Sequence, residues 1–223
     1  DWPLYEKAMN SPQEIAEIRG NYAALVAMCD EYLGKLLDYF DTHDLWKDTC
    51  LIMTTDHGLL LSEHDWWGKN LTPYYEEISH IPLMIWHPDN EEHSGERRAS
   101  LTQTPDLMPT ILDIHKCAIP PEVTGASLQP LLSDETAIHE SLIFGMFAGP
   151  VGITDGRYSY FRYPEEVSGD GLWIYTLMPA HMGSLFEIEE LKTSELGDPF
   201  NFTKGVPLLK IRLDKKNTQA GND

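Results

Sequence analysis

Residues 49–58 read TCLIMTTDHG, a short apolar run that stops at an Asp-His-Gly turn. The run does not alternate polar and apolar residues, which is typical of a strand buried on both faces. In an open α/β sheet, side chains just beyond the carboxyl end of such a strand point into the ligand crevice. Asp56 and His57 would offer there an oxygen and an imidazole nitrogen, donors that suit a divalent cation. Gly58 permits a positive φ or a close backbone approach directly after them.

By itself, Asp-His-Gly is more simply explained as a turn that ends a strand, because Asp and Gly favour turns. The residues that follow favour a binding site instead. Glu63, His64 and Lys69 come within the next dozen residues, together with the adjacent Trp66 and Trp67. Polar groups and large aromatic side chains packed this densely after a buried strand are typical of a pocket wall.

Size and charge exclude several classes of partner. The 223 residues are enough to bury a hydrophobic core, in one large domain or two small ones. A formal charge of −20, from 16 basic and 36 acidic residues, argues against nucleic acid, because little would neutralise its phosphates. The charge also argues against an anionic membrane surface, and no apolar run is long enough to span a bilayer. A metal ion and a lysine can still make one pocket locally positive for a sulfate or phosphate ester.

The cysteines and the amino terminus are less informative. Cys29, Cys50 and Cys117 are far apart and form no Cys-x-x-Cys pair, which predicts buried thiols and disfavours a structural zinc site. The chain starts at Asp1 with neither an initiating methionine nor a signal peptide. We therefore expect a fragment of a longer protein, and its compartment stays open.

Local patterns predict two helices and a strand around the Asp-His-Gly turn. Ser11, the proline after it and Glu14 form a capping box, and the apolar spacing predicts an amphipathic helix to about Phe40. Residues 83–86 predict a second strand, and residues 107–115 a further helix. The expected inner face of that helix consists of Met108, Ile111 and Leu112.

From Ala137 the pattern changes to short β-prone runs separated by turn residues. The runs are residues 142–147, 151–154, 157–163, 172–178, 185–188 and 208–213. Asp155-Gly156 between two of them is a hairpin signal. These features predict a small antiparallel sheet covered by a helix.

Four stretches together resemble the C-terminal half of a sulfatase of the alkaline-phosphatase superfamily, closest to the iduronate-type branch. They are TTDHG at 54–58, SEH at 62–64, WGK at 67–69 and HIPL at 80–83. The resemblance extends from Tyr22 to about Leu132. Ser62 departs from it, because the family usually has glycine there. The fold class it implies is α/β, with the C-terminal part of an alkaline-phosphatase-like α/β/α sandwich in residues 1–136. A small antiparallel-sheet subdomain would occupy residues 137–223, with a strand at 184–187.

The resemblance also implies a site. Asp56 and His57 would be metal ligands, with calcium the usual ion and manganese or zinc the alternative. Lys69 would contact the sulfate group, and His64 is a weaker candidate for the pocket wall. A histidine that only fixes the loop through a hydrogen bond explains His64 as well. Glu63 is expected to orient its neighbours.

The implied substrate is a small sulfated molecule such as a sulfated sugar, and self-association into a homo-oligomer is left open. The family's nucleophile motif, Cys/Ser-x-Pro-x-Arg, and its N-terminal aspartate pair do not occur in the 223 residues. We therefore expect the chain to be inactive alone. Three functions stay open: a sulfatase fragment, a phosphodiester or phosphonate-ester hydrolase of the same superfamily, and a non-catalytic binding module.

Overall fold

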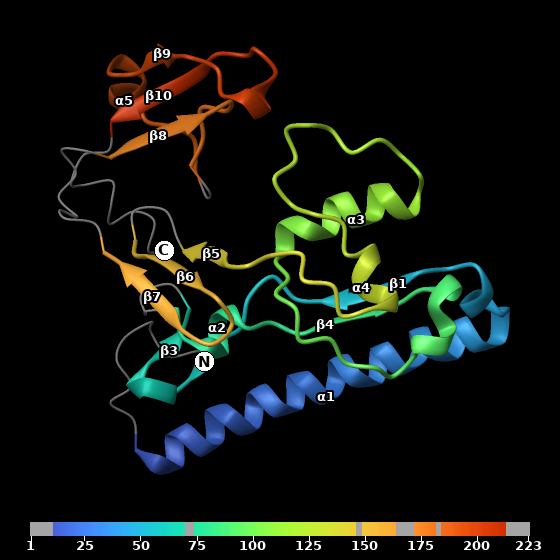
Figure 1. Ribbon diagram of the computed structural model, residues 1–223. Coiled ribbons are helices and arrows are strands. Elements are labelled where there is room, and N and C mark those ends of the chain that lie inside the picture. Colours follow the sequence, from blue (N-terminus) through green and yellow to red (C-terminus); the bar gives the residue numbers. More distant parts are fainter. Residues whose placement is uncertain (1–10, 70–73, 146–148, 164–171, 182–183, 213–223) are drawn as a thin grey trace. The chain divides into compact units, whose positions relative to one another are not determined.

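The computed structural model describes residues 11–69, 74–145, 149–163, 172–181 and 184–212 (Figure 1). The chain falls into two compact units, Asp1–Thr104 with Leu128–Glu140, and Pro105–Ser127 with Ser141–Asp223. The candidate residues after the Asp-His-Gly turn all belong to the first unit. The division into domains between residues 136 and 137 stays a prediction.

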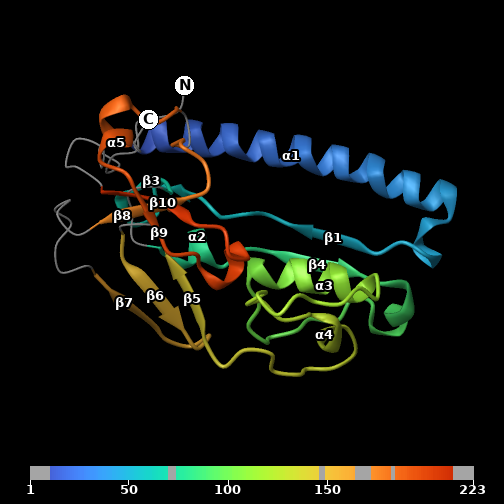
Figure 2. The same ribbon diagram turned by 90° about the horizontal axis from the view of Figure 1, so that it is seen from above.

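The first unit begins with a long helix, α1 (Pro12–His43), which lies alongside a strand pair in both views (Figures 1 and 2). The predicted capping box is confirmed, because the Glu14 amide donates to Ser11 Oγ and the Ser11 amide donates to Glu14 Oε2. The helix runs three residues past the predicted end at Phe40 and stops at Asp44, which adopts a left-handed conformation. Phe40 is the buried residue of this helix.

The strand pair carries the turn that organises the sequence. β1 (Leu51–Thr54) pairs antiparallel with β4 (Leu83–Trp86), so that Thr54 lies opposite Leu83. Both strands coincide with predicted apolar runs. The expectation that β1 is buried on both faces is wrong for the described chain, since its first three residues are half-buried and Thr54 is exposed. The physical reason is that β4 alone pairs with β1 among the described residues.

Short elements surround the turn. The 3₁₀ helix η1 (Leu45–Lys47) follows α1, and β2 (Leu60–Leu61) pairs antiparallel with β3 (Trp67–Gly68) across the 3₁₀ helix η2 (Glu63–Asp65). The elements that complete the unit are α2 (Glu76–Ser79), the 3₁₀ helix η3 (Pro88–His93) and α4 (Gln129–Ser133). Leu60, Trp67 and Ile78 are almost fully buried, which anchors β2, β3 and α2.

The second unit contains α3 (Leu107–Ile114), preceded by the 3₁₀ turn η4 (Thr104–Asp106). The predicted inner face is wrong: Met108 and Ile111 are about half exposed, whereas Pro109 and Thr110 are buried. A turn at residues 125–127 decides which side is covered. The Ala126 amide donates to Asp106 Oδ1 at 2.9 Å, and Ser127 Oγ donates to Asp113 at 2.6 Å.

Two three-stranded antiparallel sheets complete the described part of this unit. The first has the order β5 (Leu142–Gly145), β6 (Val151–Thr154) and β7 (Ser159–Arg162). The predicted hairpin at Asp155-Gly156 is confirmed, with Gly156 at φ +85°. The second sheet has the order β8 (Trp173–Thr176), β10 (Leu208–Arg212) and β9 (Glu195–Gly197).

The predicted strand at 185–188 is wrong. Leu185 makes only an isolated bridge to Ala180. Glu187 instead caps α5 (Ile188–Lys192) through a capping box with Glu190, and this local hydrogen bonding turns the chain into a helix. The 3₁₀ helix η5 (Asn201–Thr203) precedes β10. The three-residue strand β9 was not among the predicted runs.

Thiol burial also differs from expectation. Cys29 and Cys117 are exposed and Cys50 is half-buried, where burial raises the pKa of its thiol. Cys29 is exposed because it lies on α1, most of whose side chains are open to solvent. Within the described residues, no helix is long and apolar enough to cross a membrane.

Candidate functional site

Asp56 and His57 follow directly after β1, where the sequence predicted a pair of metal ligands. The His57 amide donates to Asp56 Oδ1 at 3.0 Å, and His57 Nε2 lies 3.4 Å from Asp56 Oδ2. His57 Nδ1 lies 2.9 Å from the Gly58 carbonyl oxygen. A carbonyl oxygen only accepts, so Nδ1 donates in this contact, and Nε2 is the ring nitrogen that faces the Asp56 carboxylate.

Lys69 joins this pair from the end of β3. Its Nζ contacts His57 Nε2 directly. His57 Nε2 therefore lies beside two charged groups, the Asp56 carboxylate at 3.4 Å and the Lys69 ammonium group. The structure therefore brings together three of the four predicted site residues, in an arrangement that accommodates cations.

The same cluster decides the ionisation of Asp56. Desolvation raises the pKa of its carboxyl group, but the neighbouring His57, two backbone hydrogen bonds and the charge of Lys69 lower it. The net pKa lies below its ordinary value, so the carboxylate is charged at neutral pH. An ionised, 80% exposed carboxylate is available to a ligand.

Gly58 holds the turn against α2. Its amide donates to the Ile78 carbonyl oxygen at 2.8 Å. A Cβ added to Gly58 would lie 1.8 Å from the Glu77 carbonyl oxygen, which is backbone and cannot rotate away. Of the two reasons that the sequence offered for this glycine, close backbone approach is the one that applies.

We expect Gly58→Ala to lower the free energy of unfolding by about 1–3 kcal/mol, because the new methyl group overpacks against α2. Urea denaturation followed by circular dichroism measures the change. Gly20→Ala is the matched control: nothing lies within 4 Å of its added Cβ, and alanine favours a helix over glycine by about 1 kcal/mol. Equal stability of Gly58→Ala and the parent chain would contradict the close approach.

His64 lies where α2 can hold it. Its ring stacks on Tyr75 with centroids 3.7 Å apart, and its Nε2 lies 3.3 Å from Glu77 Oε1. The side chain is 41% exposed. These contacts suit the role of a histidine that fixes the loop, and a part in the pocket wall stays a prediction. Glu77 thus contacts both the Asp-His-Gly turn and the loop after β2: its backbone oxygen lies against Gly58, and its carboxylate lies beside His64.

Sequence reasoning missed Arg19, which reaches the site loop from α1. Its Nε donates to the Leu61 carbonyl oxygen at 2.8 Å, and its Nη2 donates to Ser62 Oγ at 3.0 Å. The same Nη2 forms an ion pair with Glu63 Oε1 at 2.9 Å. Nothing local marks this arginine, because its partners are more than 40 positions away in the chain.

The loop between β2 and β3 has an unusual backbone. Ser62, His64 and Asp65 have φ values of +79°, +55° and +63°. The left-handed region costs an L-residue roughly 1–2 kcal/mol, and glycine avoids most of that cost. This explains why glycine is usual in the family at the position of Ser62.

We expect Ser62→Gly to raise the free energy of unfolding by about 0.5–1 kcal/mol, because relief of the left-handed serine outweighs the lost hydrogen bond from Arg19. The hydrogen bond from Arg19 to the Ser62 hydroxyl is exposed, so its loss offsets only part of the gain in unfolding free energy. The thermal midpoint measures it, and Ser62→Ala serves as the control that loses the hydroxyl but keeps the side-chain carbon. A Ser62→Gly midpoint at or below that of Ser62→Ala would contradict the expectation.

The described residues limit what this site can hold. Among them, no group of three or more His, Cys, Asp or Glu side chains could bind a metal ion together. Asp56 and His57 therefore present two donors, fewer than the six to eight oxygen ligands typical of calcium. A hollow of about 430 Å³ lies elsewhere, lined by Tyr175, Phe200 and Lys210 among others, and none of the candidate residues lines it.

Comparison with known proteins places the chain in a family. Residues 2–116 match the family model described as Sulfatase, and residues 62–187 match the one described as N-sulphoglucosamine sulphohydrolase, C-terminal. The chain belongs to the sulfatase family. The resemblance carried by the four stretches is thus confirmed at the level of the family, and the iduronate-type branch stays a prediction.

Two sulfatase relatives show how much of the whole molecule is present. The N-acetylglucosamine-6-O-sulfatase of Bacteroides thetaiotaomicron is 30% identical over 148 residues, which are 66% of this chain and 24% of that protein. Arylsulfatase K of Xenopus laevis is 37% identical over 186 residues, which are 75% of this chain and 33% of that protein. The chain therefore spans about a quarter to a third of the length of these relatives.

A solved structure confirms the fold. A protein in complex with its substrate D-glucosamine-2-N,6-O-disulfate superposes with a TM-score of 0.52 at 24% identity, over 70% of this chain and 37% of that one. The predicted α/β class, with a small antiparallel sheet toward the carboxyl end, is confirmed, and the described residues form two such sheets where one was expected.

Proposed function

We propose that this chain forms part of a sulfuric ester hydrolase and contributes half of its cation site together with a lysine that contacts the sulfate group. One observation carries the proposal: within a sulfatase-family chain, His57 Nε2 lies beside both the Asp56 carboxylate and the Lys69 ammonium group. The three groups come from two segments that β1, β3 and α2 bring to one place.

The chemistry follows from the charge of a sulfate ester. The ester is an anion, and negative charge grows on the leaving oxygen as the sulfur–oxygen bond breaks. A half-buried ammonium group at Lys69 would bind the sulfate oxygens and stabilise that charge. The ionised Asp56 offers its carboxylate to a cation, whereas His57 Nε2 would have to exchange its contact with Lys69 for the cation.

Asp56 and His57 fit a divalent cation in part. One carboxylate oxygen and one imidazole nitrogen are donors that calcium, manganese or zinc accept, and two donors leave the remaining ligands to other segments of the protein. We propose calcium, the ion implied by the resemblance. When bound, the cation would polarise the sulfate oxygens.

The substrate class that we propose is a sulfated amino sugar. The named activity of the Bacteroides relative and the substrate in the similar solved structure both support it. A phosphodiester or phosphonate-ester hydrolase is the other candidate that the sequence left open, and no described contact favours it.

The test is hydrolysis by a polypeptide of the relatives' length that contains residues 1–223. We expect it to hydrolyse an aryl sulfate in the presence of calcium, and the 223-residue chain alone to show no turnover of the same compound. An aryl phosphodiester with manganese is the matched assay for the other candidate. Turnover of the phosphodiester but not of the sulfate would overturn the proposed function.

A further inference from the structure

The loop that carries Glu63 and His64, and that leads through β3 to Lys69, needs support from outside itself. It is bounded by β2 and β3, which are two residues each and form one short ladder. Three non-glycine residues within it adopt left-handed backbone conformations. Such conformations persist only where surrounding contacts hold them.

The contacts come from α1. We propose that Arg19 is the positioning residue of this loop: its guanidinium group holds residues 61–63 on α1 and thereby decides where His64 and Lys69 lie. The Leu61 carbonyl oxygen, Ser62 Oγ and Glu63 Oε1 all lie within 3.0 Å of its nitrogens. Among the described contacts, none joins Arg19 to Asp56, His57 or Lys69, so Arg19 acts on the site only through the loop.

Glu63 connects the Arg19 contact to the backbone of the loop. While Oε1 pairs with Arg19, Oε2 accepts a hydrogen bond from the Leu61 amide. The Glu63 carboxylate therefore binds the backbone at the start of its own loop, at Leu61, and also binds Arg19 on α1. This agrees with the orienting role expected for Glu63.

An arginine suits this place better than a lysine. The guanidinium group is planar, with donors in a fixed fork that can serve a carbonyl, a hydroxyl and a carboxylate at once. The backbone at Arg19 is rigid, since this residue lies two turns inside a helix that begins with a full capping box. Arg19 is about half exposed, so its ion pair adds little to global stability. Its effect is expected in the geometry of the loop.

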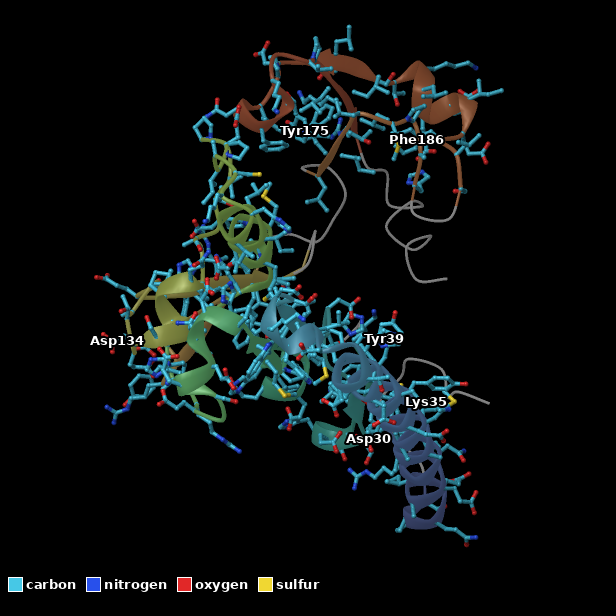
Figure 3. The ribbon with its side chains drawn as sticks, turned by 90° about the vertical axis from the view of Figure 1, so that its right-hand side faces the viewer. Asp30, Lys35, Tyr39, Asp134, Tyr175 and Phe186 are labelled. Atoms are coloured by element: carbon cyan, nitrogen blue, oxygen red, sulfur yellow. The ribbon has the colours of Figure 1, made fainter. Side chains whose placement is uncertain are left out.

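The test compares Arg19→Gln with Arg19→Lys in the 223-residue chain. Lys35→Gln is the matched control: it removes the same charge from α1, and the partners of Lys35, Glu31 and the Tyr32 ring, lie on the same helix (Figure 3). NMR measures the exchange of the Leu61 amide and the ring shifts of His64, which report its stacking on Tyr75. Thermal midpoints monitor the fold.

We expect Arg19→Gln to speed exchange of the Leu61 amide about tenfold and to move the His64 ring shifts toward free histidine, with a midpoint close to that of Lys35→Gln. Arg19→Lys should show an intermediate effect, because it keeps the charge and loses the fork. Lys35→Gln should change neither NMR signal. The proposal would be overturned if Arg19→Gln left the Leu61 exchange rate and the His64 ring shifts as in the parent chain. It would also be overturned if both signals were parental in Arg19→Lys.

The functional meaning of the positioning rests on the proposed function, and a sulfate titration separates the two. If Lys69 contacts sulfate, Lys69→Ala and Arg19→Gln both weaken binding of inorganic sulfate, the latter by about tenfold, as supporting residues of a site usually do. If Lys69→Ala leaves sulfate affinity unchanged, the sulfate role of Lys69 fails while the loop measurements still decide the role of Arg19. Sulfate affinity that falls in Lys69→Ala and stays intact in Arg19→Gln would overturn the positioning role alone.

Discussion

We expect replacement of Lys69 with alanine to lower kcat/KM for an aryl sulfate by about 10²–10³-fold, the effect of removing one preorganised group that meets charge in the transition state. The measurement uses a polypeptide of the relatives' length that contains this chain. The loss should appear mainly in kcat, since the charge on the leaving oxygen develops during the reaction. Lys69→Arg keeps the charge with a bulkier head and should recover only part of the activity.

Lys35→Ala is the control for this prediction, because Lys35 is exposed on α1 and its partner Glu31 is exposed as well. It should leave kcat/KM within twofold of the parent, as surface ion pairs have small effects. A Lys69→Ala variant with parental kcat would show that the ammonium group serves only the local arrangement of His57.

We expect Asp56→Asn to weaken calcium binding more than loss of a residue that only supports a metal ligand would, which costs roughly 10–100-fold in affinity. The amide keeps the shape of the side chain but removes the negative charge that the cation requires. Calcium titration by calorimetry measures the affinity, and an aryl sulfate assay at saturating calcium shows whether activity returns with occupancy. Both measurements use the longer polypeptide.

The matched control is Asp30→Asn on α1, which removes the same charge from an exposed position in the same unit. If Asp30→Asn and Asp56→Asn weakened calcium binding equally, overall charge would explain the effect and Asp56 would not be a ligand. His57→Ala should behave like Asp56→Asn, because Nε2 is the neighbouring donor.

Much of the fold was predictable because it depends on neighbours in the chain. The capping box of α1 and the hairpin at Asp155-Gly156 arise from contacts within a few residues, and the apolar runs at 51–54 and 83–86 mark the strands β1 and β4. Predictions that depended on burial were less successful. Cys29 is exposed and α3 buries Pro109 in place of Met108, because what covers a helix is decided by segments distant in sequence.

The candidate site shows the same division. The sequence by itself determined the candidates for the chemistry: Asp56, His57 and Gly58 stand at the end of an apolar run, and Lys69 follows eleven residues after Gly58. Only the tertiary structure decided that the Lys69 ammonium group meets His57 Nε2, and that Arg19 holds the loop between them. The physical reason is that these contacts require β2, β3 and α2 to pack around one turn. Spacing along the chain does not contain that arrangement.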